Sequence, residues 1–239
     1  MFPMGRRRRY IVFFPGRAGG SFLASNLAEH PEVLITPEPL GVRKIHLGAE
    51  GQARWVRRYY GRPLRRERAV GISTKLTDIC EPDWFAGYLR SQRMRVVLLS
   101  RDNDVKRTIS IIRARALNAE TGRWNRRSGV KTVDPTVVDP EEFATKLANN
   151  RARKEALVAY ATSLDLPLLR IDYRDLMVDP PATLARVFEH IGVEPRPVAG
   201  STLKNTSDDL RESVSNFDEL RAPYVGTEYE AMFDEVLSV

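Results

Sequence analysis

Apolar residues along the chain occur in two patterns, short continuous runs and longer segments with helical spacing. The short runs, bounded by turn residues, predict buried strands at Tyr10–Phe14, Val33–Ile35, Ala69–Leu76, Arg95–Ser100 and Leu166–Asp172. Helical spacing predicts helices that begin at or near Ser21, Trp55, Asp104, Pro140, Pro180 and Ser207. Strand and helix signals that alternate in this way predict an α/β fold with a central, mainly parallel sheet and helices on both faces.

The chain shows no internal repeat and no clear linker, so we expect one domain over residues 1–239. Residues 1–9 are predicted to form a basic N-terminal tail, and residues 120–140 a long loop. No apolar run approaches the ~20 residues that span a bilayer, and no signal peptide is evident. The single cysteine excludes an internal disulfide, and three scattered histidines argue against a metal site, so we expect no metal and a cytoplasmic location.

The chain is basic, with a net charge of +7 and an isoelectric point of about 9.7. Only seven of its 38 basic residues are lysine, so 31 are arginine. Arginine binds phosphate and sulfate oxygens in a forked geometry, which makes an anionic partner plausible. An Arg-rich but ordinary solvated surface explains the excess equally well, and the run Arg6–Arg9 has the same two interpretations.

A glycine-rich turn, Gly16-Arg17-Ala18-Gly19-Gly20-Ser21, follows the first predicted strand and leads into a helix. Strand, Gly-rich turn and helix is the layout that binds phosphate through backbone amides and the helix N-terminus. No lysine follows Gly20, which argues against an ATP- or GTP-binding loop, and the glycine spacing does not fit a dinucleotide site. A tight connection without a ligand remains the alternative.

A second anion-binding segment is predicted after the strand Arg95–Ser100. Arg101 stands at the carboxyl end of this strand, where ligands of open α/β sheets bind, and Ser110 lies on the helix that follows. An arginine and a hydroxyl in this arrangement can hold a phosphate. A surface ion pair between Arg101 and Asp102 or Asp104 is the alternative.

These segments resemble, in the correct order, the sulfotransferases that use 3′-phosphoadenosine 5′-phosphosulfate (PAPS). The first motif of that family corresponds to the turn at Arg17–Ser21, followed by His30-Pro31 and Glu38-Pro39, and the second to Arg101 and Ser110. A third likeness is Ile171–Leu176 with Asp179-Pro180, before a helix that ends at Ile191-Gly192-Val193. The resemblance implies a three-layer fold related to the P-loop NTPases.

The resemblance also implies the residues that bind PAPS, which would be the cofactor, with no metal. They are Arg17, Ala18, Gly19, Gly20, Ser21 and Phe22 for the 5′-phosphosulfate, Arg101 and Ser110 for the 3′-phosphate, and Lys204 in a late basic loop.

This sequence departs from the family pattern at three points. Ala18 and Gly20 replace two hydroxyl residues. The spacing from Arg101 to Ser110 is one residue longer than in cytosolic sulfotransferases, so the second hydroxyl is either Thr108 or Ser110. The Lys-x-His motif reads Lys75-Leu76-Thr77 and has no histidine. The longer spacing is more similar to the bacterial trehalose sulfotransferases.

Sulfuryl transfer needs a cation at the leaving oxygen and a base at the acceptor hydroxyl. We expect Arg17 to supply the cation and Glu38, in a proline-flanked loop, to act as the base, as the trehalose-type resemblance implies. His46 is the second candidate for the base, and Lys75 is a further candidate for binding the sulfuryl group or the acceptor.

The sequence therefore predicts a sulfotransferase that acts on a hydroxyl of a small molecule, a sugar or a glycolipid. A P-loop-related kinase and a non-catalytic nucleic-acid-binding protein are the alternatives, although we expect no nucleic-acid partner and no transmembrane segment. The acceptor and the oligomeric state stay open, a homodimer included.

Overall fold

The computed structural model describes residues 8–41, 45–62, 66–121, 135–198 and 208–237. Internal contacts divide the chain into two compact units, each described here by itself. The first unit comprises Met1–Ser100 and Glu155–Thr202, and the second Arg101–Lys154 and Leu203–Val239. The organisation of residues 1–239 as a single domain stays a prediction.

The first unit is built on a five-stranded sheet with the strand order β2-β3-β1-β4-β5. The strands are β1 (Arg8–Phe13), β2 (Val33–Pro37), β3 (Ala69–Thr74), β4 (Arg95–Ser100) and β5 (Leu168–Asp172). Every pairing between neighbours is parallel, so all five carboxyl ends lie at one edge. The predicted parallel sheet is confirmed, and its central strand β1 is the one that leads into the Gly-rich turn.

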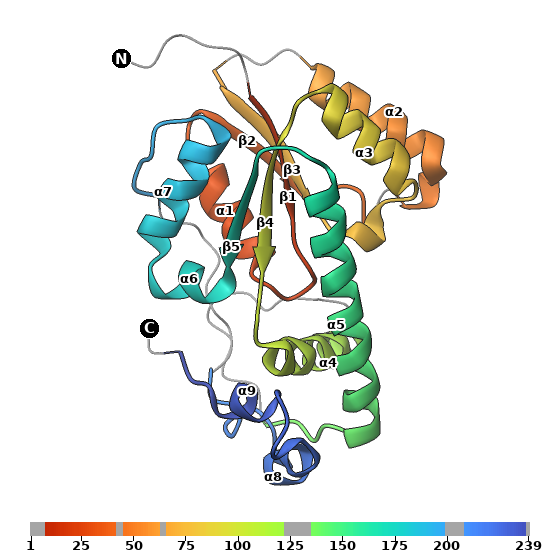
Figure 1. Ribbon diagram of the computed structural model, residues 1–239, viewed down its shortest axis with the longest axis vertical. Coiled ribbons are helices and arrows are strands. Elements are labelled where there is room, and N and C mark those ends of the chain that lie inside the picture. The colour runs from red at the N-terminus through yellow and green to blue at the C-terminus, as the bar shows by residue number, and fades with distance from the viewer. Residues whose placement is uncertain (1–7, 42–44, 63–65, 122–134, 199–207, 238–239) are drawn as a thin grey trace. The chain divides into compact units, whose positions relative to one another are not determined.

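Helices cover both faces of this sheet (Figure 1). On one side lie α1 (Gly20–Ala28) and α7 (Pro180–Ile191); on the other lie α2 (Gly48–Gly61), α3 (Pro82–Ser91) and the last part of α5 (Pro140–Ser163). Ile11 and Phe13 of β1 pack toward the second group, in a core with Phe85 and Leu157. Strands buried on both faces read as continuous apolar runs, which is why their positions could be predicted.

The segment after β5 ends in local capping motifs that the sequence contains. Asp172 caps the short helix α6 (Tyr173–Val178), and Asp179 caps α7 by accepting a hydrogen bond from the Ala182 amide. Gly192 ends α7 in the left-handed region at φ 84°, as glycine at this position predicts. The predicted helix Pro180–Ile191 is confirmed with the same bounds.

The second unit is helical within its described residues and holds α4 (Asp104–Thr121), the first part of α5, α8 (Phe217–Arg221) and α9 (Glu230–Asp234). Its apolar core joins Val105 and Ile109 of α4 to aromatic residues of the other helices. A buried polar network also ties α4 to α5, because Arg107 and Lys154 both bond to the Asp104 carboxylate.

The two histidines that are buried or half-buried in the first unit serve the fold. His30 accepts a hydrogen bond from the Glu32 amide at Nδ1, and its Nε2 lies 3.0 Å from the Glu194 carbonyl. The Nε2 of His190 lies 2.9 Å from the Val96 carbonyl, and burial lowers the pKa of His190 from its ordinary value. The imidazole rings of both residues form hydrogen bonds with backbone groups and so have a structural role.

Several predicted elements need correction. The helix expected from Trp55 begins at Gly48, and α3 was not anticipated. The helix expected over Ser207–Leu220 is limited to α8 at Phe217–Arg221. Arg8 and Arg9 belong to β1 and not to a basic tail. Most of the expected loop at 120–140 lies outside the described residues.

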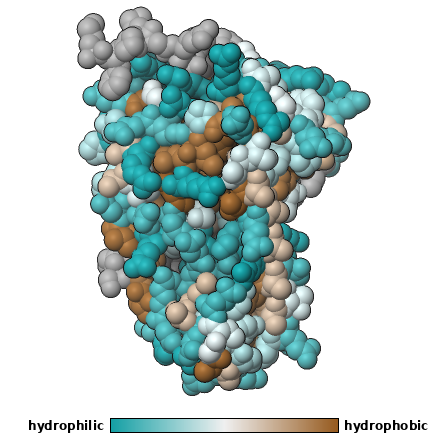
Figure 2. Space-filling view, viewed as in Figure 1, coloured by the Kyte–Doolittle hydropathy of each residue, from teal (hydrophilic) through white to brown (hydrophobic). Residues whose placement is uncertain are grey.

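Hydrophilic side chains cover most of the face seen in Figure 2. None of the helices in the described segments combines the length and apolar character that crossing a bilayer requires.

Candidate functional site

The turn between β1 and α1 is tightly packed, and its backbone is left-handed at Arg17 (φ 65°) and Gly19. Gly19 has φ 87°, and a Cβ atom there would lie 2.8 Å from the Tyr173 ring. A Cβ at Gly20 would lie 2.5 Å from two ring atoms of Phe14. The Phe14 ring thus fills the space that a side chain at position 20 would need.

The turn presents backbone amides because α1 starts directly after it. Gly19 is the N-cap of this nine-residue helix and has no side-chain cap, and its carbonyl accepts the Leu23 amide at 2.9 Å. The amides of the first helical turn have no partner within a helix, so a helix N-terminus binds anions readily. Ala18 is fully buried, whereas Arg17 and Ser21 are exposed. These features fit the phosphosulfate that the resemblance implies.

A carboxylate and a lysine lie at the carboxyl ends of the two strands beyond β1. Glu38 follows β2, has φ 45°, and donates its amide to the Ser73 carbonyl of β3 at 2.9 Å. Lys75 follows β3, and its ammonium contacts the Glu38 carboxylate. Parallel pairing of β2 and β3 therefore brings together two residues that are 37 positions apart in the sequence.

The Glu38–Lys75 pair adjoins the Gly-rich turn. The Lys75 ammonium lies 5.6 Å from the centre of the Phe14 ring, and its Cε would be 3.9 Å from a Cβ at Gly16. The first unit thus combines the Gly-rich turn, a lysine and a carboxylate at one edge of the sheet. A cation and a carboxylate so placed can bind an anionic group and accept a proton.

Asp78 is a third charged member of this cluster that the sequence analysis missed. It closes the 3₁₀ helix η2 (Leu76–Asp78), and its Oδ2 lies 3.6 Å from the Lys75 ammonium. Burial raises the pKa of Asp78, while the charge of Lys75 opposes this effect. No motif identified Asp78; its position three residues after a strand-end lysine was the one available signal.

The remaining candidates of the first unit have different outcomes. His46, the second candidate for the base, is exposed in the 3₁₀ helix η1 (Ile45–Leu47). Glu38, the first candidate, contacts the Lys75 ammonium. Phe22 is half-buried in the first turn of α1. The aromatic residues Tyr59 and Tyr60 of α2 do not offer a platform for a sugar: they are buried, and their hydroxyls donate to backbone carbonyls of the sheet, so they are core residues.

In the second unit, the structure separates the two candidate hydroxyls of α4. Thr108 is fully buried and accepts a hydrogen bond from Asn150, whereas Ser110 is half-buried. Arg101, directly after β4, is also half-buried. Because a ligand can reach Ser110 but not the fully buried Thr108, Ser110 is the better candidate for the hydroxyl that binds a phosphate. Lys204 lies outside the described residues.

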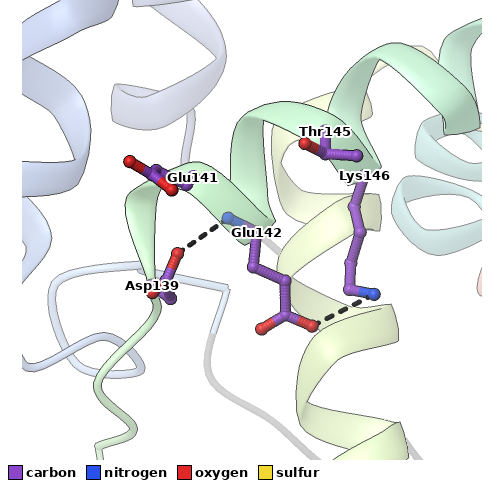
Figure 3. Close-up of a pocket in the computed structure, with 5 residues that line it drawn as sticks. All are labelled: Asp139, Glu141, Glu142, Thr145 and Lys146. Atoms are coloured by element: carbon purple, nitrogen blue, oxygen red, sulfur yellow. Dashed lines mark hydrogen bonds and ion pairs between the residues drawn. The ribbon is translucent and has the colours of Figure 1, made fainter.

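A hollow of about 410 Å³ in the second unit lies at the start of α5 (Figure 3). Its lining includes Asp139, Glu141 and Glu142, with Lys146 bonded to Glu142 at 3.0 Å. The Asp139 carboxylate accepts the Glu142 amide at 2.7 Å and so caps the helix. Three carboxylates against one ammonium make this hollow unsuited to an anionic donor.

Comparisons with known proteins agree with the predicted resemblance, although no family model matches the chain. Nodulation protein H of Rhizobium tropici is 26% identical, over 94% of this chain and 92% of the relative. A sulfotransferase structure from Alicyclobacillus acidocaldarius matches with a TM-score of 0.50 at 18% identity, over 98% of each chain. The sulfotransferase domain of the curacin biosynthetic pathway matches with a TM-score of 0.52 at 16% identity, over 98% of this chain and 93% of that one. The resemblance inferred from the motifs is therefore confirmed: the chain has the fold of the solved sulfotransferases and is similar over nearly its whole length to nodulation protein H.

Proposed function

We propose that this chain is a PAPS-dependent sulfotransferase that transfers a sulfuryl group to a hydroxyl of a carbohydrate acceptor. The observation that carries the proposal is the edge of the sheet in the first unit, where the Gly-rich turn, Lys75 and Glu38 meet. The likeness to the trehalose sulfotransferases supports a carbohydrate acceptor.

Each group of the donor has candidate residues. The amides from Gly19 to Phe22 would bind the 5′-phosphosulfate, and Arg17 would neutralise charge on its bridging oxygen. Arg101 and Ser110 would bind the 3′-phosphate. The bound donor supplies the sulfuryl group.

Glu38 is proposed to accept the proton of the acceptor hydroxyl. Its loop is fixed by the hydrogen bond from the Glu38 amide to Ser73, so the carboxylate is held at the edge of the sheet. Lys75, between this carboxylate and the Gly-rich turn, would neutralise negative charge near the reacting oxygens. General base catalysis by a positioned carboxylate contributes about 10²–10⁴-fold to the rate.

The alternatives fit less well. A kinase of the P-loop class uses a lysine directly after the last glycine of its loop, and Ser21 occupies that position. A nucleic-acid-binding role would explain the arginine excess but gives no reason for the Glu38–Lys75 pair beside the turn.

Incubation of the full chain with ³⁵S-labelled PAPS and a panel of sugars, oligosaccharides and glycolipids tests the proposal. We expect label transfer to a hydroxyl of at least one acceptor, and its loss in Glu38→Gln. Thermal shift with adenosine 3′,5′-bisphosphate, ATP with Mg²⁺, and an oligonucleotide separates the alternatives, because a ligand of the native state raises the melting temperature. Stabilisation by ATP with Mg²⁺ but not by the bisphosphate would refute the proposal in favour of a kinase.

The cytoplasmic location predicted from the single cysteine stays a prediction, and the oligomeric state stays open. Fractionation of cells that express the tagged protein checks the first, and light scattering of the purified chain checks the second.

A further inference from the structure

We infer that Asp78 is a positioning residue that holds the Lys75 ammonium beside the Glu38 carboxylate, and that Gln52 fixes Asp78 in place. The inference rests on the proposed function, because it concerns how the proposed base and its neighbouring lysine are oriented.

The three charged groups differ in their access to solvent. The side chain of Asp78 is 16% exposed, compared with 29% for Lys75 and 36% for Glu38. The Asp78 Oδ2 atom is itself buried and forms no hydrogen bond with the residues that the structure describes. Gly41 packs closely against the Asp78 Oδ2 atom, because a Cβ added at Gly41 would lie 3.3 Å from this oxygen. Asp78 is therefore the inner, fixed carboxylate of the cluster.

Lys75 is the cation shared by the two carboxylates. Its ammonium contacts Glu38 on one side and lies 3.6 Å from Asp78 Oδ2 on the other. A lysine side chain is long and has several rotatable bonds, so one carboxylate partner alone restricts it little. A second, buried carboxylate directs the ammonium to one position and leaves Glu38 at the solvent-accessible side.

The backbone of Asp78 is held by the buried side chain of Gln52. The Gln52 amide donates to the Asp78 carbonyl at 2.8 Å and to the Leu40 carbonyl at 3.1 Å. Its oxygen accepts the Cys80 amide at 3.0 Å. Leu40 is two residues after Glu38, so one side chain of α2 ties the loop of the proposed base to the loop of Asp78.

Catalysis depends steeply on position, and a displacement of about 1 Å can reduce a rate by ~10²-fold. Replacing the Asp78 carboxylate with the amide of Asn keeps the shape but removes the charge that directs Lys75. We therefore expect Asp78→Asn to lower kcat about 10- to 100-fold. The binding of adenosine 3′,5′-bisphosphate should not change, because the proposed contacts to this ligand lie elsewhere.

Asp78→Asn is compared with Asp83→Asn, a matched removal of one exposed charge on α3. The supporting result is a lower kcat for Asp78→Asn alone, with the Kd for the bisphosphate and the circular dichroism spectrum unchanged. A kcat equal to that of the unmodified protein, or an equal loss in Asp83→Asn, would overturn the inference.

A second measurement needs no activity and so separates this inference from the proposed function. The carboxyl ¹³C resonance of Asp78 is titrated in the unmodified chain, in Glu38→Gln and in Lys75→Met. The charge of Glu38 raises the pKa of Asp78 and that of Lys75 lowers it. The midpoint should therefore fall in Glu38→Gln and rise in Lys75→Met. Unchanged midpoints would overturn the inference even if transfer occurs, whereas a chain that transfers no label refutes only the proposed function.

Discussion

Replacing Gly20 by alanine should destabilise the first unit, because the Phe14 ring occupies the space that the new methyl group needs. Gly20 has no positive φ, so the change introduces no backbone strain and tests packing alone. The added Cβ would lie 2.5 Å from Cδ2 and Cε2 of Phe14 and 2.9 Å from its Cγ. Carbon atoms in contact are normally about 3.5–4.0 Å apart, so the ring must move by about 1 Å.

The expected size of the effect follows from two opposing contributions. Overpacking of a buried site costs about 1–3 kcal/mol, and the Phe14 side chain is only 3% exposed. Alanine is favoured over glycine inside a helix by up to about 1 kcal/mol, and Gly20 is the first residue of α1, where this gain is smaller. The free energy of unfolding should therefore fall by about 1–2 kcal/mol.

The assay is urea unfolding of Gly20→Ala, Phe14→Leu and the double variant, followed by both circular dichroism and tryptophan fluorescence. Coincident transitions from the two probes justify a two-state treatment. Leucine has no Cε2 and no rigid ring, so it relieves part of the clash, and the double variant should lose less stability than the sum of the single changes. The coupling free energy should be about 1 kcal/mol. A fully stable Gly20→Ala, or additive effects of the two changes, would refute the packing argument.

Three further outcomes follow from the structure. Asp104→Ala should lower the free energy of unfolding by about 3–5 kcal/mol in urea, because it leaves the buried Arg107 without its carboxylate. Glu142→Ala removes a carboxylate that is itself exposed and should cost less than about 1 kcal/mol, so equal losses would contradict this reasoning. Burial lowers the pKa of His190 in the folded chain, so the unfolded chain takes up the proton at a higher pH than the folded chain does. The melting temperature should therefore fall as the pH drops through about 6.5, and it should fall less in His190→Gln. Arg17→Ala should reduce sulfuryl transfer about 10²–10³-fold, and near-normal turnover would remove Arg17 from the chemistry.

The inner strands of the sheet, β3, β1 and β4, were predictable because they are buried on both faces. Arg95–Ser100 was predicted with the bounds of β4, and the strand at Tyr10–Phe14 differs from β1 only at its ends. The start of α2 was missed because Gly48 and Gly51 read as loop residues. In the structure Gly51 packs against Leu47, the N-cap residue of α2, with no room for a side chain. This local contact explains a glycine inside the helix despite its low helix propensity.

The candidate site could be predicted in part. The Gly-rich turn and Glu38 were identified because strand-end motifs are local in the sequence. The contact between Glu38 and Lys75 depends on which strands become neighbours, and strand order is not written in any short segment. Asp78 and Gln52 take part through burial and backbone hydrogen bonds, for which a single sequence carries no pattern.

Gln52 also has an evolutionary consequence. The side-chain amide of Gln52 bonds to the backbone of Leu40 in the loop after β2, and of Asp78 and Cys80 in the loop after β3. A change in the length of either loop that moves these backbone groups would break hydrogen bonds of Gln52. Insertions and deletions at this edge of the sheet should therefore be inherited together with a change at Gln52, and descendants that keep the glutamine should keep both loop lengths.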